Sequence, residues 1–207
     1  MTDTKWTRRK EARPAEIIEA ATAIFIRVGY AAANLDDVAH QAGIAKGTLY
    51  RYFSDKQSLF RAVVQQAIGR NIEALEAAGG RMNGAIEELV PKLLALAADR
   101  SGAGRAPALA RMVIAESQAF PDLAAIWHDN VVSRVLSMLS GLIREAQAKG
   151  EVRQGDPLIH AFSIVGPMLA ALLFHEVFSS TSTQAPDLPR LAEQHAETVL
   201  RGLLKPV

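Results

Sequence analysis

Apolar residues recur along most of this chain every three or four positions, the spacing that places them on one face of an α-helix. Ile17, Ala21, Phe25 and Val28 form the first stripe, Pro14 suits the first turn of that helix and Gly29 suits its end. Further stripes predict helices at residues 54–78, 83–99, 108–120, 122–149, 157–178 and 187–204. No stretch alternates between apolar and polar residues over the length of a strand, so the pattern predicts an all-α protein.

Two shorter helices are predicted between Asn34 and Phe53, in the stretch NLDDVAHQAGIAKGTLYRYF. The side-chain oxygen of Asn34 can cap the first helix by accepting a hydrogen bond from a free amide of its opening turn. Gly43 stands where a left-handed residue would end that helix, and the second helix is expected to start near Ala45 or Lys46. Two short helices joined by a tight turn predict a helix-turn-helix, which lays its second helix in the DNA major groove.

The second of these helices is expected to have one buried and one exposed face. At about 100° per residue, Leu49 and Phe53 project together toward the first helix. On the other side, Arg51 can pair with guanine and Thr48 can contact a base edge, whereas Lys46 and tyrosine hydroxyls suit phosphates. The predicted DNA contacts are Asn34, Lys46, Gly47, Thr48, Tyr50, Arg51, Tyr52 and Lys56. The alternative is a surface helix whose aromatic side chains cover their neighbours.

The run AGIAKGTLYRYFSDKQSL, Ala42–Leu59, resembles the DNA-binding signature of the TetR/AcrR family of bacterial transcriptional regulators. The similarity continues upstream through Ile17–Tyr30 and Leu35–Ala39, so that it covers about the first third of the chain. One departure is Ala45, where the family often has a serine that caps the recognition helix. Losing such a cap weakens a helix start by ~1 kcal/mol.

Three segments are expected: a basic N-terminal arm at 1–12, a three-helix helix-turn-helix domain at 13–58, and an effector-binding and dimerisation domain at 59–207. The arm is either a disordered tail or an arm that contacts DNA. Ser54 and Gln57 fit the capping box of the helix at 54–78, which is long enough to link the two domains. Lys56 lies in its first turn, where a phosphate would meet a helix N-terminus.

The bulk properties narrow the classes of function. The formal net charge of this 207-residue chain is only +1, so DNA binding must come from a local patch. Cysteine is absent, which excludes disulfides, thiolate metal ligands and a thiol nucleophile. The apolar run Ile164–Phe174 is too short to span a bilayer and the N-terminus does not resemble a signal peptide. We therefore expect a soluble cytoplasmic protein that binds no membrane, metal or cofactor and is not an enzyme.

An effector site and a dimer interface are expected in the C-terminal two thirds. Methionines and aromatic residues suit an adaptable apolar pocket, in which Glu116 or His128 could fix a polar group. The effector candidates are Met112, Glu116, Phe120, Trp127, His128, Phe162 and Met168. The alternative is that they are ordinary core residues.

The family resemblance implies that the last two helices form the dimer interface, and a helix that is apolar nearly all round must be buried on several sides. The interface candidates are Ile164, Leu169, Leu173, Leu191, Val199 and Leu203. The alternative is that the core of one protomer covers them.

The resemblance implies a homodimeric regulator, expected to be a repressor, that binds a palindromic double-stranded DNA operator and is released by a small, largely apolar effector. Two rival classes stay open: a helical-bundle protein that binds a small molecule or acts as an enzyme, and a DNA-binding protein without an effector. A large C-terminal pocket would disfavour the second.

Overall fold

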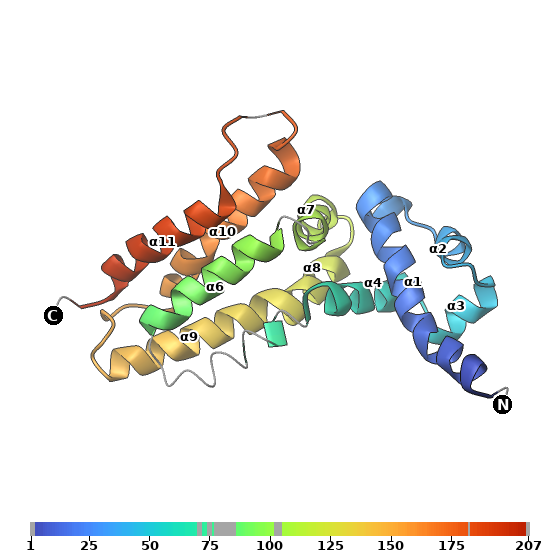
Figure 1. Cartoon of the computed structure of the whole chain (residues 1–207), viewed down its shortest axis with the longest axis horizontal. Coiled ribbons are helices and arrows are strands. Elements are labelled where there is room, and N and C mark those ends of the chain that lie inside the picture. The colour runs from blue at the N-terminus through green and yellow to red at the C-terminus, as the bar shows by residue number, and fades with distance from the viewer. Residues whose placement is uncertain are drawn as a thin grey trace.

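The computed structural model describes residues 3–69, 72–73, 76, 86–101, 105–181 and 183–205, with the backbone alone at 3–12 and 99–101. Within these residues every regular element is a helix, which confirms the all-α prediction (Figure 1). The elements are α1 Asp3–Ala32, α2 Leu35–Gln41, α3 Lys46–Tyr52, α4 Lys56–Val64, α6 Ile86–Ser101, α7 Ala106–Glu116, α8 Pro121–Trp127, α9 Ser133–Ala148, α10 Pro157–Phe178 and α11 Leu188–Leu203, with π-helical segments η1 Gln65–Gly69 and η2 His128–Val132.

Helices α1, α2 and α3 form a small unit at one end of the molecule (Figure 1, blue to cyan). Its core contains Phe25, Val38 and Leu49, all fully buried, because the apolar stripes of the three helices face one another. Phe53 also lies in this core, as the sequence predicts. Val28 does not: its side chain is 44% exposed, because it lies on the outer face of the last turn before α1 is interrupted.

Helix α1 starts earlier than the sequence predicts. Its backbone is helical from Asp3, so the basic segment continues the helix and Pro14 lies inside it. Lysine, arginine, glutamate and alanine, which dominate residues 5–13, are good helix formers and account for the longer helix. The regular helix is interrupted at Gly29, whose φ of 83° and ψ of 172° are accessible to glycine at little cost.

Helix α4 connects the small unit to the rest of the chain. Its capping box is formed by Asp55 and Ser58, one residue later than the predicted pair Ser54 and Gln57. Asp55 and Ser54 are both good caps, and Asp55 is the one whose backbone is extended at the helix start. The helix passes into η1 after Val64, and the remainder of the helix predicted at 54–78 lies largely outside the described residues.

Four helices, α6, α9, α10 and α11, pack as a bundle at the other end (Figure 1). Their common core is separate from that of the small unit and includes Leu94, Leu139, Ile143 and Ile164. The predicted helix at 122–149 is divided into α8 and α9 by η2, in which the hydrogen bonds run one residue longer. Helix α10 has the predicted bounds, and α11 is one residue shorter at each end than predicted.

Helix α10 is also long and apolar enough to cross a membrane by length and composition, although only 22% of its most apolar window is buried in the protomer. A helix that packs in the core of a soluble protein can pass the same test. Ile164 and Met168 of α10 do face the bundle core, while much of the remaining apolar surface of the helix is open.

Candidate DNA interface and ligand cavity

The turn between α2 and α3 has the geometry of a helix-turn-helix. Asn34 caps α2, its side-chain oxygen accepting a hydrogen bond of 3.0 Å from the amide of Asp36. Gly43 adopts a φ of +64°, the left-handed conformation that ends α2. Ala45 stands at the N-cap of α3 without a side-chain hydrogen bond, because alanine has no acceptor to offer. The start of α3 is therefore held by its packing rather than by a side-chain cap.

Helix α3 is anchored from one side and open on the other. Leu49 is fully buried against the small core, whereas Tyr50 is 44% exposed and Gly47 and Arg51 are also exposed. Thr48 is half-buried, as is Tyr52, the remaining predicted contact on this helix. The predicted DNA contacts of α3 thus share one short helix whose outer side carries a cation, hydroxyl groups and a glycine.

The basic side chains of α3 have neighbours within the small unit. Lys46 Nζ lies 2.7 Å from the carboxylate of Asp36 and 6.0 Å from the ring centre of Tyr50. The hydrogen bond to Asp36 raises the pKa of Lys46. Arg51 stacks over Tyr52, with its Cζ 5.5 Å from the ring centre. The ion pair between Lys46 and Asp36 is exposed on both sides, so it contributes little to the stability of the fold and can open at little cost.

Lys56, a predicted phosphate contact, binds backbone carbonyl groups within the protein. Its ammonium group donates to the carbonyl oxygens of Tyr30, Ala31 and Ala33, at 2.7, 3.3 and 2.9 Å, and lies 4.6 Å from the ring centre of Tyr30. An ammonium group has three N–H bonds, and here each has a carbonyl partner. Burial lowers the pKa of Lys56, and the negative charge of Glu116 opposes this shift. Lys56 therefore holds the end of α1 instead of facing outward.

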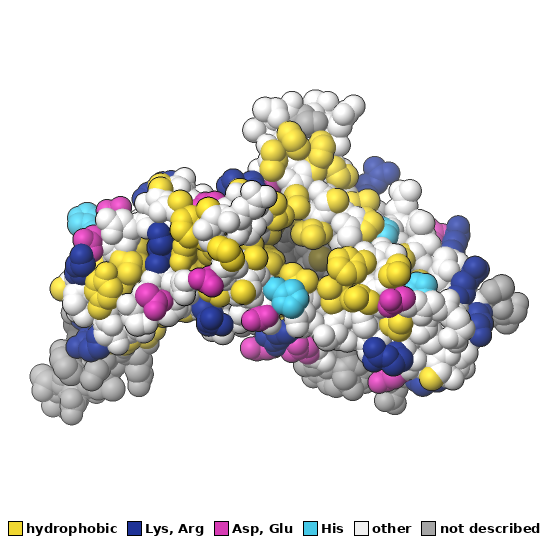
Figure 2. All heavy atoms as spheres, turned by 180° about the vertical axis from the view of Figure 1, so that it is seen from behind, with side chains coloured by type: hydrophobic (Ala, Val, Ile, Leu, Met, Phe, Trp, Pro, Cys, Tyr) yellow, Lys and Arg dark blue, Asp and Glu magenta, His cyan; other side chains and the backbone are white. Residues whose placement is uncertain are grey.

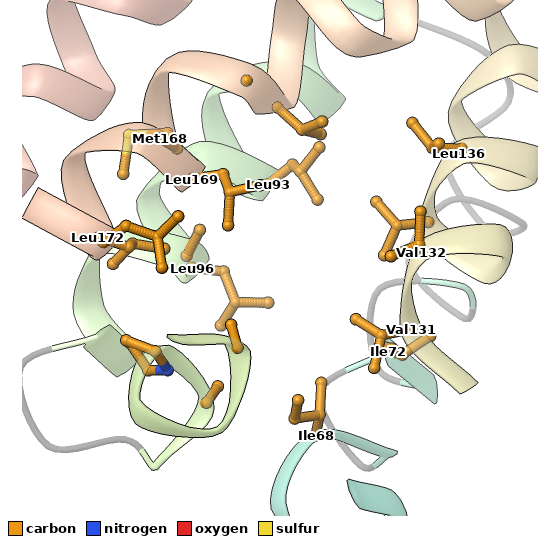
Figure 3. A pocket seen from close by; sticks show the side chains of 18 of the residues that line it. Ile68, Ile72, Leu93, Leu96, Val131, Val132, Leu136, Met168, Leu169 and Leu172 are labelled. Carbon is orange, nitrogen blue, oxygen red and sulfur yellow. The ribbon is translucent and has the colours of Figure 1, made fainter. Parts of the chain in front are cut away.

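A cavity of about 340 Å³ lies between η1, α6, α7, η2, α9 and α10. Figure 3 shows Leu93, Val132, Leu136 and Leu172 projecting into it from α6, η2, α9 and α10. Figure 2 shows hydrophobic side chains gathered around a hollow on one face of the molecule. Among the described lining residues none carries an ionisable side chain, and the only side-chain N–H is that of Trp127. Such a wall favours apolar ligands.

The seven predicted effector residues lie in different places. Trp127, Phe162 and Met168 line the cavity. Met112 and Phe120 pack instead in and against the core of the small unit, where Phe120 meets the Tyr30 ring at a centroid distance of 5.3 Å. The remaining two are not among the described lining residues either: Glu116 binds backbone amides of α1, and the exposed His128 faces Asp129.

Most of the described cavity wall consists of residues that the sequence did not single out. Leucine, isoleucine, valine and alanine at helical spacing look alike whether they fill a core or line a cavity, so no local signal marks them. Examples are Ile68, Leu93, Val135 and Leu172.

The predicted interface residues lie in two different environments in the protomer. Ile164, Val199 and Leu203 are buried in the core of a single protomer, because α10 and α11 pack on α6 and α9 through these positions. Leu191 packs partly buried against the same core. The two others, Leu169 and Leu173, line the cavity, and Leu169 is 48% exposed.

An apolar surface nevertheless remains open on α10. Ile159 is 64% exposed, and Leu158, Phe162, Val177 and Phe178 are each about half exposed. Ile159 and Val177 are separated by 18 residues, which is five turns at about 3.6 residues per turn, so they lie on the same side of the helix. Side chains of this size are seldom left open together unless a partner covers them.

Comparison with known proteins agrees with this architecture. Residues 17–63 match the family model described as "Bacterial regulatory proteins, tetR family", and residues 88–202 match the model "AefR-like transcriptional repressor, C-terminal domain". The chain is 27% identical over 148 residues to the HTH-type transcriptional regulator UidR of Escherichia coli K12, covering 69% of this chain and 71% of UidR. Some other curated regulators match over less; for YfiR of Bacillus subtilis the match spans 33% of its length.

Solved structures show the same fold over nearly the whole chain. A protein from Mesorhizobium loti described as a TetR-family regulator has a TM-score of 0.71 at 26% identity, covering 95% of this chain and 99% of the other. FadR of Bacillus subtilis, solved with stearoyl-CoA, has a TM-score of 0.74 at 21% identity, covering 91% of this chain and 98% of the other. With one model matching the helix-turn-helix end and another more than half of the chain, this protein belongs to the TetR family of bacterial transcriptional regulators.

Proposed function

We propose that this protein is a homodimeric repressor that binds a palindromic DNA operator and leaves it when a small, largely apolar effector occupies the cavity. The observation that carries the proposal is α3, which is anchored by the buried Leu49 and presents Gly47, Tyr50 and Arg51 outward. Two such helices in a dimer would enter successive major grooves about 34–36 Å apart. The C-terminal family model is that of a repressor, which supports repression rather than activation.

The effector class is supported by the cavity and by two proteins of the same fold. FadR of Bacillus subtilis was solved with stearoyl-CoA, and SmeT, at a TM-score of 0.76 and 22% identity, with triclosan. In this chain the described cavity wall offers apolar contact and no counter-ion. Burying an unpaired charge there would cost several kcal/mol or more, so the buried part of the effector is expected to be uncharged.

The dimer is expected to form through the open apolar side of α10, which includes Ile159 and Val177. This surface differs from the predicted set, of which Ile164, Val199 and Leu203 are already covered within one protomer. A two-fold axis on this side would pair α10 with its copy, since the same patch serves both subunits.

A binding-site selection from random DNA tests the function. We expect the wild type to enrich a palindrome, and an Arg51→Ala variant to lose preference at particular base pairs, by about 1–3 kcal/mol per bidentate contact. Tyr50→Phe removes only a hydroxyl and should weaken all sites about equally, because phosphate contacts carry no sequence information. The matched control is Arg190→Ala on the exposed side of α11, which should change nothing. Failure of the wild type to enrich any sequence would reject the proposal.

The effector site can be tested with decan-1-ol as an uncharged probe and the decyltrimethylammonium ion as its charged counterpart. Trp127 lines the cavity and reports binding by fluorescence once the second tryptophan is removed by Trp6→Phe. We expect decan-1-ol to shift the emission and to lower operator affinity. Equal binding of the ammonium ion would contradict an uncharged effector. A shift in emission without any change in operator affinity would contradict coupling between the cavity and operator binding.

A further inference from the structure

The turn at the end of α1 exposes backbone groups that the helix itself cannot satisfy. The regular helix is interrupted at Gly29, and the amides of Tyr30 and Ala31 lie just beyond this point. Both amides donate to the carboxylate of Glu116, at 3.0 and 2.7 Å, from a residue more than 80 positions along the chain. Charge-assisted bonds of this kind are stronger than bonds between neutral groups.

Gly29 is required at this joint for two separate reasons. Its φ of 83° is one that other residues adopt only with strain. In addition, a Cβ atom at this position would overlap Oε1 of Glu116. A side chain at residue 29 would therefore push the Glu116 carboxylate away from this position.

The same turn is held from its other side by α4. Lys56 donates to the carbonyl oxygens of Tyr30, Ala31 and Ala33, so that carbonyls and amides of one turn are bound by opposite charges from two helices. The Tyr30 ring packs between Phe25, Phe60 and Phe120. The end of α1 is thus clamped to the C-terminal part of the chain by polar and aromatic contacts together.

Helix α7, which ends in Glu116, is also a wall of the cavity. Ala106, Pro107 and Ala110 line it from the first half of the helix. Arg105, at the helix start, forms an ion pair with Glu19 of α1. Helix α7 therefore lies against α1 while contributing to the cavity, and a displacement of α7 would reach α1 through Glu116.

We propose that Glu116 is a positioning residue for operator binding, which fixes the angle between the small DNA-binding unit and the C-terminal bundle and thereby the separation of the two α3 helices. The inference rests on the proposed dimeric function. Loss of a residue that only stabilised the fold would weaken binding to a half-site as much as binding to the full operator. Loss of a positioning residue would weaken binding to the full operator alone. That difference provides the test.

The experiment compares Glu116→Ala and Glu116→Gln with wild type on the selected full operator, on one isolated half-site, and in a selection in which the spacing between half-sites is varied. The matched control is Glu193→Ala, an exposed residue of α11. We expect Glu116→Ala to keep its half-site affinity, to lose five- to 150-fold on the full operator, the usual range of coupling between sites, and to accept a wider range of spacings. Glu116→Gln retains one acceptor oxygen and should lie between Glu116→Ala and wild type.

Unchanged full-operator affinity and spacing in Glu116→Ala would overturn the proposal. So would an equal loss on half-site and full operator, since that would show a weakened DNA-binding unit rather than a misplaced one. If wild type itself enriched no DNA sequence, the proposed function would fail first. If wild type bound well and the variant behaved like Glu193→Ala, only the role of Glu116 would be rejected.

Discussion

At the scale of single residues, Lys56 shows how a charge that suits DNA can be used inside the protein. Replacing it by methionine keeps the length of the side chain but removes the donor shared by three carbonyl groups. We expect Lys56→Met to lower the free energy of unfolding by about 1–3 kcal/mol, measured by urea denaturation. Lys149→Met, at an exposed position after α9, is the control and should stay within about 0.5 kcal/mol of wild type. Equal stability of both variants would show that Lys56 is dispensable to the fold.

Asp55 makes the stability of α4 depend on pH. Hydrogen bonds from the Ser58 amide and the Ser54 hydroxyl lower the pKa of Asp55 below 3.8. Its stabilisation is therefore fully present above the ordinary aspartate range, near 4, and is lost as the pH falls through the lowered pKa. We expect Asp55→Asn to be less stable than wild type at about pH 6 and the difference to shrink below about pH 4. The side chain is exposed, so the difference should be below about 1 kcal/mol, and a difference independent of pH would exclude the charge as its cause.

Residue positions were predictable from sequence where the signal was local. The Asn34 cap, the left-handed Gly43 and the buried Leu49 depend on neighbours within about ten positions and were found. The contacts of Glu116 and Lys56 to the end of α1 join residues far apart in sequence, and no spacing rule anticipates a side chain that binds a distant backbone.

At the scale of elements, α10 combines a core face, a cavity wall and an open apolar side. These three surfaces could not be distinguished from the sequence, because most residues of the helix are apolar. The bounds of α10 and α11 were predictable because capping residues mark their starts, whereas the start of α1 and the end of α7 were not. The π-helical segments η1 and η2 were not, because a one-residue change in hydrogen bonding has no compositional signature. The cavity wall was missed for the most part because its residues continue the same apolar stripes as the core.

Gly166 offers a way to fill the cavity from α10. It lines the cavity, and a Cβ added there meets no atom within 4 Å. Gly166→Leu should therefore occupy ligand space, weaken decan-1-ol binding at least tenfold, and leave the unfolding free energy equal or up to about 1 kcal/mol higher, because glycine is a poor helix former. Gly202→Leu, in an open and exposed position of α11, is the matched control for helix propensity. Titration by Trp127 fluorescence measures the binding, and unchanged affinity in Gly166→Leu would place the ligand elsewhere.

At the scale of the whole molecule, operator recognition depends on geometry that a single chain does not contain. One protomer has one α3, and a palindromic operator needs two at a fixed separation. In the proposed dimer, the open side of α10 would place the two bundles and the Glu116 joint would place each DNA-binding unit on its bundle. Sequence patterns could indicate the need for a partner surface, but only the packing of α10 shows which of its sides is left open.

Ile159 tests whether that open side joins two protomers. It is 64% exposed in the protomer, so Ile159→Asp should leave the single chain folded, whereas in a dimer the new carboxylate would be buried without a partner. The cost of several kcal/mol should make the variant monomeric in sedimentation velocity at micromolar concentration. Affinity for the full operator should then be lost while affinity for a half-site is kept. The Glu116→Ala variant should show the same change in affinities but remain dimeric. Gln194→Asp, on the polar exposed side of α11, is the control and should remain dimeric. An Ile159→Asp protein that is folded and still dimeric would move the interface away from this side of α10.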